Sequence, residues 1–157
     1  MIKIAVISGS RGTREFLRQG LSVFSGIEFV YGGQSLSRHF RGLAEAHPNI
    51  ILVDVGSPNT FSDEIKPDFP KIHKSLPETK VLIRTDLPET AEFVRRAVDS
   101  GASIIDSRLG ISRIVEAMTT ISDGRDVIWY AGREHDLESH EPPGWRLFTR
   151  GSSRKES

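Results

Sequence analysis

The sequence contains no cysteine among its 157 residues. Disulfide bonds, thiol nucleophiles and thiolate metal sites are therefore all excluded. It also lacks an excess of either charge, because 21 basic residues balance 21 acidic ones, so no overall field directs the chain to nucleic acid or to a membrane surface. No run approaches the roughly 20 apolar residues of a membrane span. We expect a soluble, cytoplasmic protein without membrane contacts.

Five short apolar runs recur along the chain, and valine and isoleucine dominate them: IKIAVI, IEFVY, NIILVDV, KVLIR and ASIID. Several lack the alternation of a half-exposed strand, which is typical of strands buried on both faces of a sheet. Segments with helical spacing of apolar residues lie between or after them, at residues 13–24, 88–99 and 110–122. This order predicts an α/β fold, in which a parallel sheet carries helices on both faces.

The alternating pattern stops after Gly124. We therefore expect one domain over residues 1–124. Residues 125–157 are polar and rich in proline, glycine and serine, which predicts a tail, or a linker toward an output domain that is missing here or absent. Within this segment, DVIWYAG is compatible with a short extension of the domain.

Polar residues follow several of the predicted strands, where a parallel sheet of this kind gathers its ligands and its chemistry. They come after the first, third, fourth and fifth strands: Ser8 and Gly9, Asp54, Thr85 and Asp86, and residues 106–108. Serine, aspartate and threonine are also common turn residues, and for Asp86 we expect that role. Two readings stay open: a functional site, or ordinary strand ends.

The ordered set of segments resembles the receiver domain of bacterial response regulators, most closely the LuxR-type or NarL-like receivers attached to helix-turn-helix output domains. The resemblance runs from Ile2 to about Gly124. Within HPNIILVDVGSP, Asp54 and Pro58 reproduce the family's Asp-x-x-x-Pro pattern, and LPETKVLIRT ends in the family's hydroxyl residue. The resemblance implies a flavodoxin-like, doubly wound fold with a five-stranded parallel sheet in the order 2-1-3-4-5.

The resemblance also assigns roles to four positions. Asp54 falls on the phosphoacceptor, and Thr85 on the hydroxyl that moves toward the phosphoryl group. Ile105 occupies the position of the aromatic switch residue, and Arg108 that of the family's lysine. Because isoleucine is smaller and has no hydroxyl, we expect Ile105 to stay in the core and the switch to be broken or rewired.

The largest departure from the family concerns magnesium. The family places two acids at the end of the first strand, where this sequence has Ser8 and Gly9. Mg²⁺ prefers hard oxygen ligands and is usually held by one or two carboxylates together with phosphate oxygens. We therefore expect no metal site, no cofactor, and weak or no Mg²⁺-dependent phosphorylation of Asp54. We expect Arg108 or Arg11 to pair with Asp54 instead.

These features predict an atypical receiver, or pseudo-receiver, that is not an enzyme and serves signal transduction and transcription regulation through protein contacts. The resemblance implies a homodimer through the fourth helix, fifth strand and fifth helix, which here would carry charges of both signs: Arg95, Arg96, Asp99, Arg113 and Glu116. DNA binding is expected only if an output domain follows residue 157.

An alternative starts from the segment KIAVISGSRGTREF, which resembles the opening of flavodoxin-like FMN reductases. In those proteins, Gly-Ser after the first strand begins a phosphate-binding loop. The loop Ser8–Thr13, with the backbone N–H groups of a helix start, would suit a small anion, a nucleotide or FMN. Flavin binding also needs an aromatic residue after the third strand, where the sequence offers Phe61.

Overall fold

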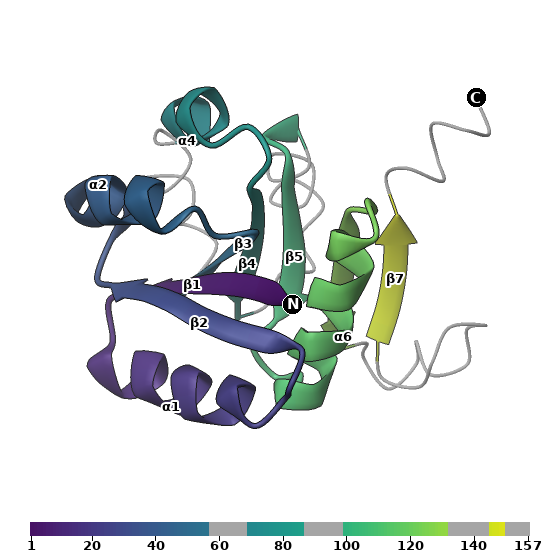
Figure 1. Cartoon of the computed structure of the whole chain (residues 1–157). Helices are drawn as coiled ribbons and strands as arrows, with labels where there is room; N and C mark the ends of the chain where they lie inside the picture. The colour runs from purple at the N-terminus through teal and green to yellow at the C-terminus, as the bar shows by residue number, and fades with distance from the viewer. Residues whose placement is uncertain (57–68, 87–98, 132–144, 150–157) are drawn as a thin grey trace.

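A computed structural model describes residues 1–56, 69–86, 99–131 and 145–149 (Figure 1). Strands and helices alternate along most of this chain, as the apolar pattern predicts. In chain order they are β1 (Ile2–Ser8), α1 (Arg11–Ser22), β2 (Ile27–Gly33), α2 (Leu36–Ala46), β3 (Ile50–Val55), α4 (Phe69–Ser75), β4 (Lys80–Thr85), β5 (Ala102–Asp106), α6 (Ile111–Ser122), β6 (Val127–Ala131) and β7 (Trp145–Thr149).

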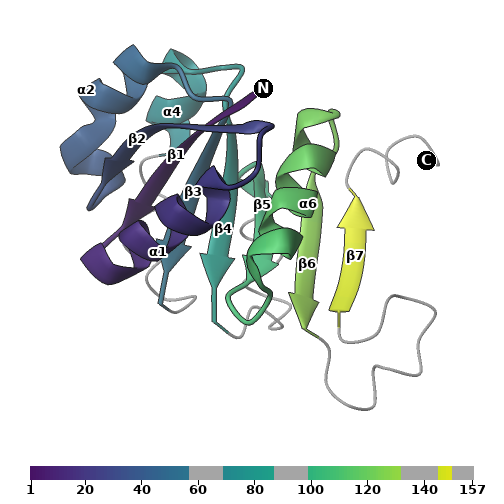
Figure 2. The same ribbon diagram turned by 60° about the horizontal axis from the view of Figure 1, so that its bottom comes forward.

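All strands join one sheet in the order β2-β1-β3-β4-β5-β6-β7. The first five pair in parallel, which confirms the predicted order 2-1-3-4-5. Figure 2 shows β3, β4 and β6 ending at the same edge of the sheet, while β7 runs the opposite way. This shared carboxyl edge is where the polar strand ends of the sequence come together.

Helices cover both faces of the sheet and create two apolar layers. Leu17 of α1 and Met118 of α6 pack with Ile4, Leu52 and Ile105 on one face. On the other face, α2 and α4 pack on the alternate strand residues, and Figure 1 shows these two helices above the sheet with α1 below it. The side chains of successive strand residues point to opposite faces of the sheet. The side chain of each residue at the carboxyl edge therefore lies on the face of α1 and α6 or on the face of α2 and α4.

Serine side chains cap the N-termini of α1 and α2 at this edge of the sheet. The Ser10 hydroxyl accepts a hydrogen bond from the Thr13 amide (3.1 Å) and begins α1. The Ser35 hydroxyl accepts one from the Arg38 amide (3.3 Å) and begins α2. Such caps satisfy N–H groups that have no partner inside the helix. They fix where the loops after β1 and β2 turn away from the sheet.

Part of the segment 125–157 is more than the expected tail or linker. Val127–Ala131 pairs in parallel with β5, and Trp145–Thr149 pairs antiparallel with β6. The sheet therefore continues beyond residue 124, while the division into a domain and a linker stays a prediction. In the parts of the chain that the structure describes, no helix has the length and apolar character needed to cross a membrane.

Gly101 is required by its backbone conformation, and its replacement by alanine should be costly. Its φ of +86° lies where side chains other than glycine are strained, and a Cβ there would lie 3.3 Å from the His73 ring. We expect Gly101→Ala to lower the free energy of unfolding by about 1–2 kcal/mol, as measured by urea denaturation. Gly26→Ala is the control, because a Cβ at Gly26 meets nothing within 4 Å. Equal effects of the two substitutions would contradict the prediction.

Candidate functional site

Three polar residues form one row across the carboxyl edge of the sheet. Ser8 of β1 is in register with Asp54 of β3, and Asp54 is in register with Arg84 of β4. The residues two positions earlier in these strands belong to the layer under α1 and α6. Because side chains alternate between faces, the row lies on that same face. Parallel pairing thus brings together a hydroxyl, a carboxylate and a guanidinium from three distant segments.

Each carboxylate oxygen of Asp54 accepts a hydrogen bond. The Arg84 Nη1 donates to Oδ1 at 2.5 Å, and the Ser8 hydroxyl donates to Oδ2 at 3.2 Å. The ion pair is largely shielded from water, since the side chains of Arg84 and Asp54 are 15% and 14% exposed. Water and salt screen a charge-assisted bond in such a shielded place less than they screen an exposed pair. Asp54 is therefore held by a charge within the protein.

Arg84 also reaches the loop after β5. Its Nη2 donates to the Ser107 carbonyl at 3.2 Å, and Ser107 donates its own hydroxyl to the Asp86 carboxylate. Among the described residues, the buried Nε of Arg84 has no hydrogen-bond partner. The guanidinium thus connects the end of β3 to the β5–α6 loop. For Asp86, the expected role of a turn residue is compatible with its place directly after β4.

A cleft of about 780 Å³ opens above this row. It lies between the loops after β1 and β2 on one side and the ends of β3 and β4 on the other. Many of the residues that line the cleft carry hydroxyl groups, and Asp54 and Arg84 also line it. Its described lining is Ile7, Ser8, Gly9, Ser10, Thr13, Gln34, Ser35, Ser37, Val53, Asp54, Val55, Gly56, Arg84, Asp86 and Ser107.

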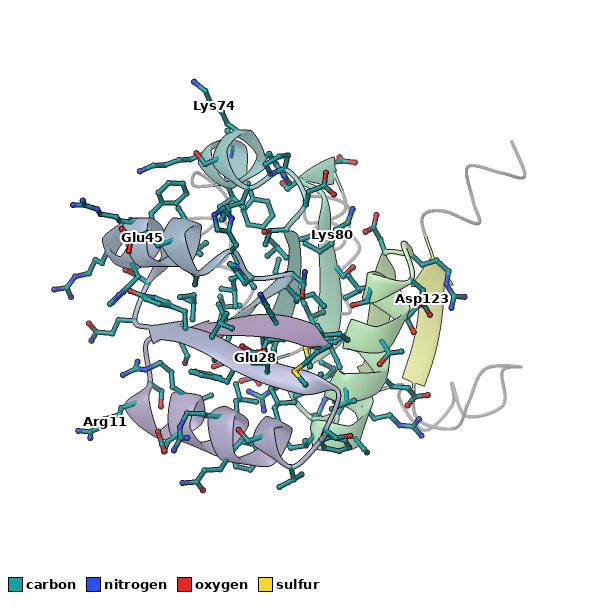
Figure 3. The ribbon with its side chains drawn as sticks, in the orientation of Figure 1. Arg11, Glu28, Glu45, Lys74, Lys80 and Asp123 are labelled. Carbon is teal, nitrogen blue, oxygen red and sulfur yellow. The ribbon has the colours of Figure 1, made fainter. Side chains whose placement is uncertain are left out.

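The expectation that Arg108 or Arg11 pairs with Asp54 is wrong. Arg108 turns back on Asp106, donating from Nη2 at 2.5 Å and from its backbone amide at 2.8 Å. Asp106 is completely buried, and its carboxylate needs this nearby charge. Arg11 is exposed, and Figure 3 shows its side chain at the start of α1 pointing away from the sheet. The partner of Asp54 is Arg84, which lies in the apolar run KVLIR that predicts a strand.

Thr85 and Ile105 are both fully buried. Ile105 belongs to the core layer under α6, as expected for a residue that stays inside. Thr85 is in register with Val55, one position past Asp54, so alternation places it on the opposite face from the Asp54 row. Its hydroxyl donates to the Asp86 carbonyl at 3.3 Å. The switch roles that the resemblance gives these residues stay predictions.

Among the residues that the structure describes, those around Asp54 do not fit a magnesium ion. Ser8 and Gly9 bring no carboxylate, and Arg84 places a positive charge directly on the Asp54 oxygen. Across the described ranges, no three His, Cys, Asp or Glu residues gather in a way that could hold a metal ion. Mg²⁺ would have to displace a guanidinium and then rely on few hard ligands.

Another charge pair lies on α1, outside the cleft lining. A hydrogen bond from Arg18 to Glu15 is the main cause that lowers the pKa of the Glu15 carboxyl. The same bond raises the pKa of Arg18. Both groups are in contact with solvent, so the pair lies on the helix surface and contributes little to the stability of the fold.

A scan against models of protein families finds no match, and a search of curated proteins finds none either.

Comparison with solved structures does give matches. The receiver domain of the putative response regulator NarL from Mycobacterium tuberculosis is 18% identical, with a TM-score of 0.68 over 79% of this chain and 98% of that one. A LuxR-family two-component response regulator from Aurantimonas sp. SI85-9A1 is 20% identical, with a TM-score of 0.69 over 80% and 88%. The isolated receiver domain of RcsB from Salmonella enterica serovar Typhimurium, in the presence of the phosphomimetic BeF3-, is 10% identical with a TM-score of 0.67 over 80% and 91%.

Identities this low establish the likeness of the fold alone. The chain has the fold of response-regulator receiver domains of the NarL and LuxR type.

Proposed function

We propose that this chain is an atypical receiver domain of a signal-transduction protein, which acts through contacts with other proteins and not through Mg²⁺-dependent phosphorylation of Asp54. One observation carries the proposal: the 2.5 Å ion pair between Asp54 and Arg84. The resemblance assigns the phosphoacceptor position to Asp54, and the charge of this carboxylate is already neutralised by Arg84. Such a domain has no enzymatic step to perform and serves as a binding module in transcription regulation.

The ion pair opposes phosphorylation in two ways. An aspartate that attacks a phosphoryl donor depends on the negative charge of its carboxylate, and here Arg84 pairs with that charge while Ser8 donates a hydrogen bond to the second oxygen, so both oxygens are weaker nucleophiles. In phosphoryl transfer a metal ion also neutralises the charge on the transferred group, and the acids that would hold this ion are replaced by Ser8 and Gly9. Both the nucleophile and its metal assistance are therefore impaired.

Output through protein contacts would use the face expected from the resemblance. Its fourth helix, with Arg95 and Arg96, lies outside the described residues. In α6, Arg113 donates to Glu116 at 2.7 Å, and both side chains are about half exposed, which suits a polar protein interface. A homodimer through this face belongs to the proposal, and DNA binding belongs to it only if an output domain follows residue 157.

A second candidate function is the binding of a small anion, a nucleotide or FMN in the cleft. The loop Ser8–Thr13 lines the cleft, as do Ser35 and Ser37 near the start of α2. Helix starts attract anions. Phe61, the residue required for flavin stacking, lies outside the described residues. A yellow purified protein, or a rise in melting temperature with inorganic phosphate, would favour this candidate over the receiver function.

Incubation with Mg²⁺ and acetyl phosphate tests the proposal directly. We expect the intact mass of the protein to stay unchanged, because Arg84 neutralises the Asp54 carboxylate and no acids stand at positions 8 and 9 to hold Mg²⁺. The matched control is Asp54→Asn, which should give the same spectrum. A near-complete phosphoryl adduct on the wild-type protein that disappears in Asp54→Asn would overturn the proposal.

A further inference from the structure

The helix α6 begins without a side-chain cap. Serine hydroxyls cap α1 and α2, whereas the N-cap of α6 is Gly110, which makes no side-chain hydrogen bond. The backbone closes the first turn, since the amides of Arg113 and Ile114 donate to the Gly110 carbonyl at 3.0 and 3.2 Å. The buried side chains of α6 begin at Ile114. The position of the turn before them therefore depends on the preceding loop, residues 107–110.

Ser107, the first residue of this loop, is bound by three successive residues at the end of β4. Its amide donates to the Thr85 carbonyl at 2.9 Å. Its carbonyl accepts from the Arg84 Nη2 at 3.2 Å, and its hydroxyl donates to the Asp86 carboxylate. Among the described contacts of Ser107, the one with Arg84 leads on to another strand, because Nη1 of the same guanidinium donates to Asp54 on β3 at 2.5 Å.

The guanidinium of Arg84 is oriented by its two ends. Nη1 and Nη2 have different partners, and the buried Nε has no hydrogen-bond partner in the described part of the chain. A guanidinium is a rigid planar fork, so the direction of Nη1 determines the direction of Nη2. The bond to Asp54 joins opposite charges, whereas the Ser107 carbonyl is neutral, so Asp54 is the stronger partner. Asp54 thus sets the position from which Arg84 reaches Ser107.

We propose that Arg84 is a latch that couples the charge of Asp54 to the start of α6. While Asp54 is charged, it holds the guanidinium against the Ser107 carbonyl, and the loop keeps one conformation with no phosphoryl group present. When the charge of Asp54 is lost, the guanidinium is released from β3 and its hold on Ser107 weakens. The loop and the first turn of α6 then open locally and not globally, because the bonds of Ser107 to Thr85 and Asp86 remain.

The latch deepens the proposed function, and it rests on that function in one respect: it takes the exposed side of α6, with Arg113 and Glu116, as a contact face. The charges of the protein itself hold the start of this helix in place, so the binding of a partner there needs no covalent signal. Removal of the Asp54 charge acts in this scheme as a release of the face and not as its activation.

Hydrogen exchange of the full chain, resolved by residue, tests the coupling. The readout is the set of bonded amides in the loop and the first turn: Ser107, Leu109, Arg113 and Ile114. In Asp54→Asn they should exchange at least about tenfold faster than in the wild type, relative to the amides in the middle of β1, which report global unfolding. Glu45→Gln is the matched control, because it removes the acid of an exposed ion pair on α2 and should leave the same amides unchanged.

A cycle of variants tests whether Arg84 carries the effect. In the Arg84→Leu background, Asp54→Asn should change the exchange of these amides by less than about twofold against the same reference, because the latch is already open. Arg84→Lys keeps a positive charge but replaces the fork by a single ammonium. It should open the loop as Asp54→Asn does, and it carries the test alone if Asp54→Asn fails to fold.

Two results would overturn the inference. One is unchanged exchange of the loop amides in Asp54→Asn or in Arg84→Lys. The other is an equal acceleration by Asp54→Asn with and without Arg84. The experiment uses no phosphoryl donor, so its failure is distinct from a failure of the phosphorylation test.

Discussion

Replacing Arg84 by leucine is expected to lower the free energy of unfolding by about 2–4 kcal/mol at neutral pH. The substitution leaves the Asp54 carboxylate, 14% exposed, without its counter-charge. It also removes the donor of the Ser107 carbonyl. Loss of one partner from a shielded ion pair costs more than the pair itself contributes, because the remaining charge is poorly solvated. Urea denaturation of the full chain, followed by circular dichroism, measures the change.

A double-mutant cycle with Asp54→Asn separates the ion pair from the packing of Arg84. In the Asp54→Asn background, Arg84→Leu should cost at least about 1 kcal/mol less than in the wild type, because no charge is left unpaired. Arg113→Leu is the matched control, since the Arg113–Glu116 pair is about half exposed and should contribute under about 1 kcal/mol. An effect of Arg84→Leu no larger than that of Arg113→Leu would contradict the importance of the pair.

The identity of this ion pair was not predicted from the sequence, although part of the signal was present. Arg84 ends the apolar run KVLIR and was assigned to the strand with its neighbours. A charged residue in a buried strand needs a partner, and that requirement alone points to an acid nearby. Which acid it is depends on the register of β3 against β4, and residues 30 positions apart in the chain give no local indication of that register.

Arg108 illustrates the opposite error. Its position in the resemblance suggested that it would reach Asp54, as the family's lysine reaches the phosphoacceptor. The nearer acid was Asp106, two residues earlier, which is completely buried and receives hydrogen bonds from the Arg108 side chain and amide. A buried carboxylate competes strongly for any guanidinium within reach. Transfer of a role by position therefore fails where a neighbouring buried acid binds the same guanidinium.

The fold was easier to predict than the site because the periodic apolar pattern indicates the strands and helices, and the resemblance implies their order. Five strands, their order and helices on both faces follow from that pattern and from the resemblance, and the structure contains them. The two extra strands were harder to predict. β7 lies in a segment whose prolines, glycines and serines indicated a linker, and its pairing with β6 joins residues on either side of the stretch 132–144. A five-residue strand carries too little periodicity to be distinguished from a linker.

Restoring the missing acids should create a magnesium site and a phosphoacceptor. In the variant Ser8→Asp, Gly9→Asp, Arg84→Leu, three carboxylates would share one edge with no guanidinium between them. The Ser8 hydroxyl lies 3.2 Å from the Asp54 carboxylate, so an acid at position 8 would lie close enough to share a cation. A Cβ at Gly9 meets nothing within 4 Å. Carboxylates in such proximity repel each other unless a cation neutralises them.

We therefore expect the melting temperature of this variant to rise with Mg²⁺, because a ligand that binds the folded state stabilises it by about 1.4 kcal/mol at ten times its dissociation constant. Acetyl phosphate with Mg²⁺ should then give a phosphoryl adduct, detected by intact mass, that the wild-type protein does not form. The matched control adds Asp54→Asn to the same variant, which should lose the adduct and weaken the response to Mg²⁺. An unchanged melting temperature and no adduct would mean that Ser8, Gly9 and Arg84 are not what keeps Asp54 from reacting.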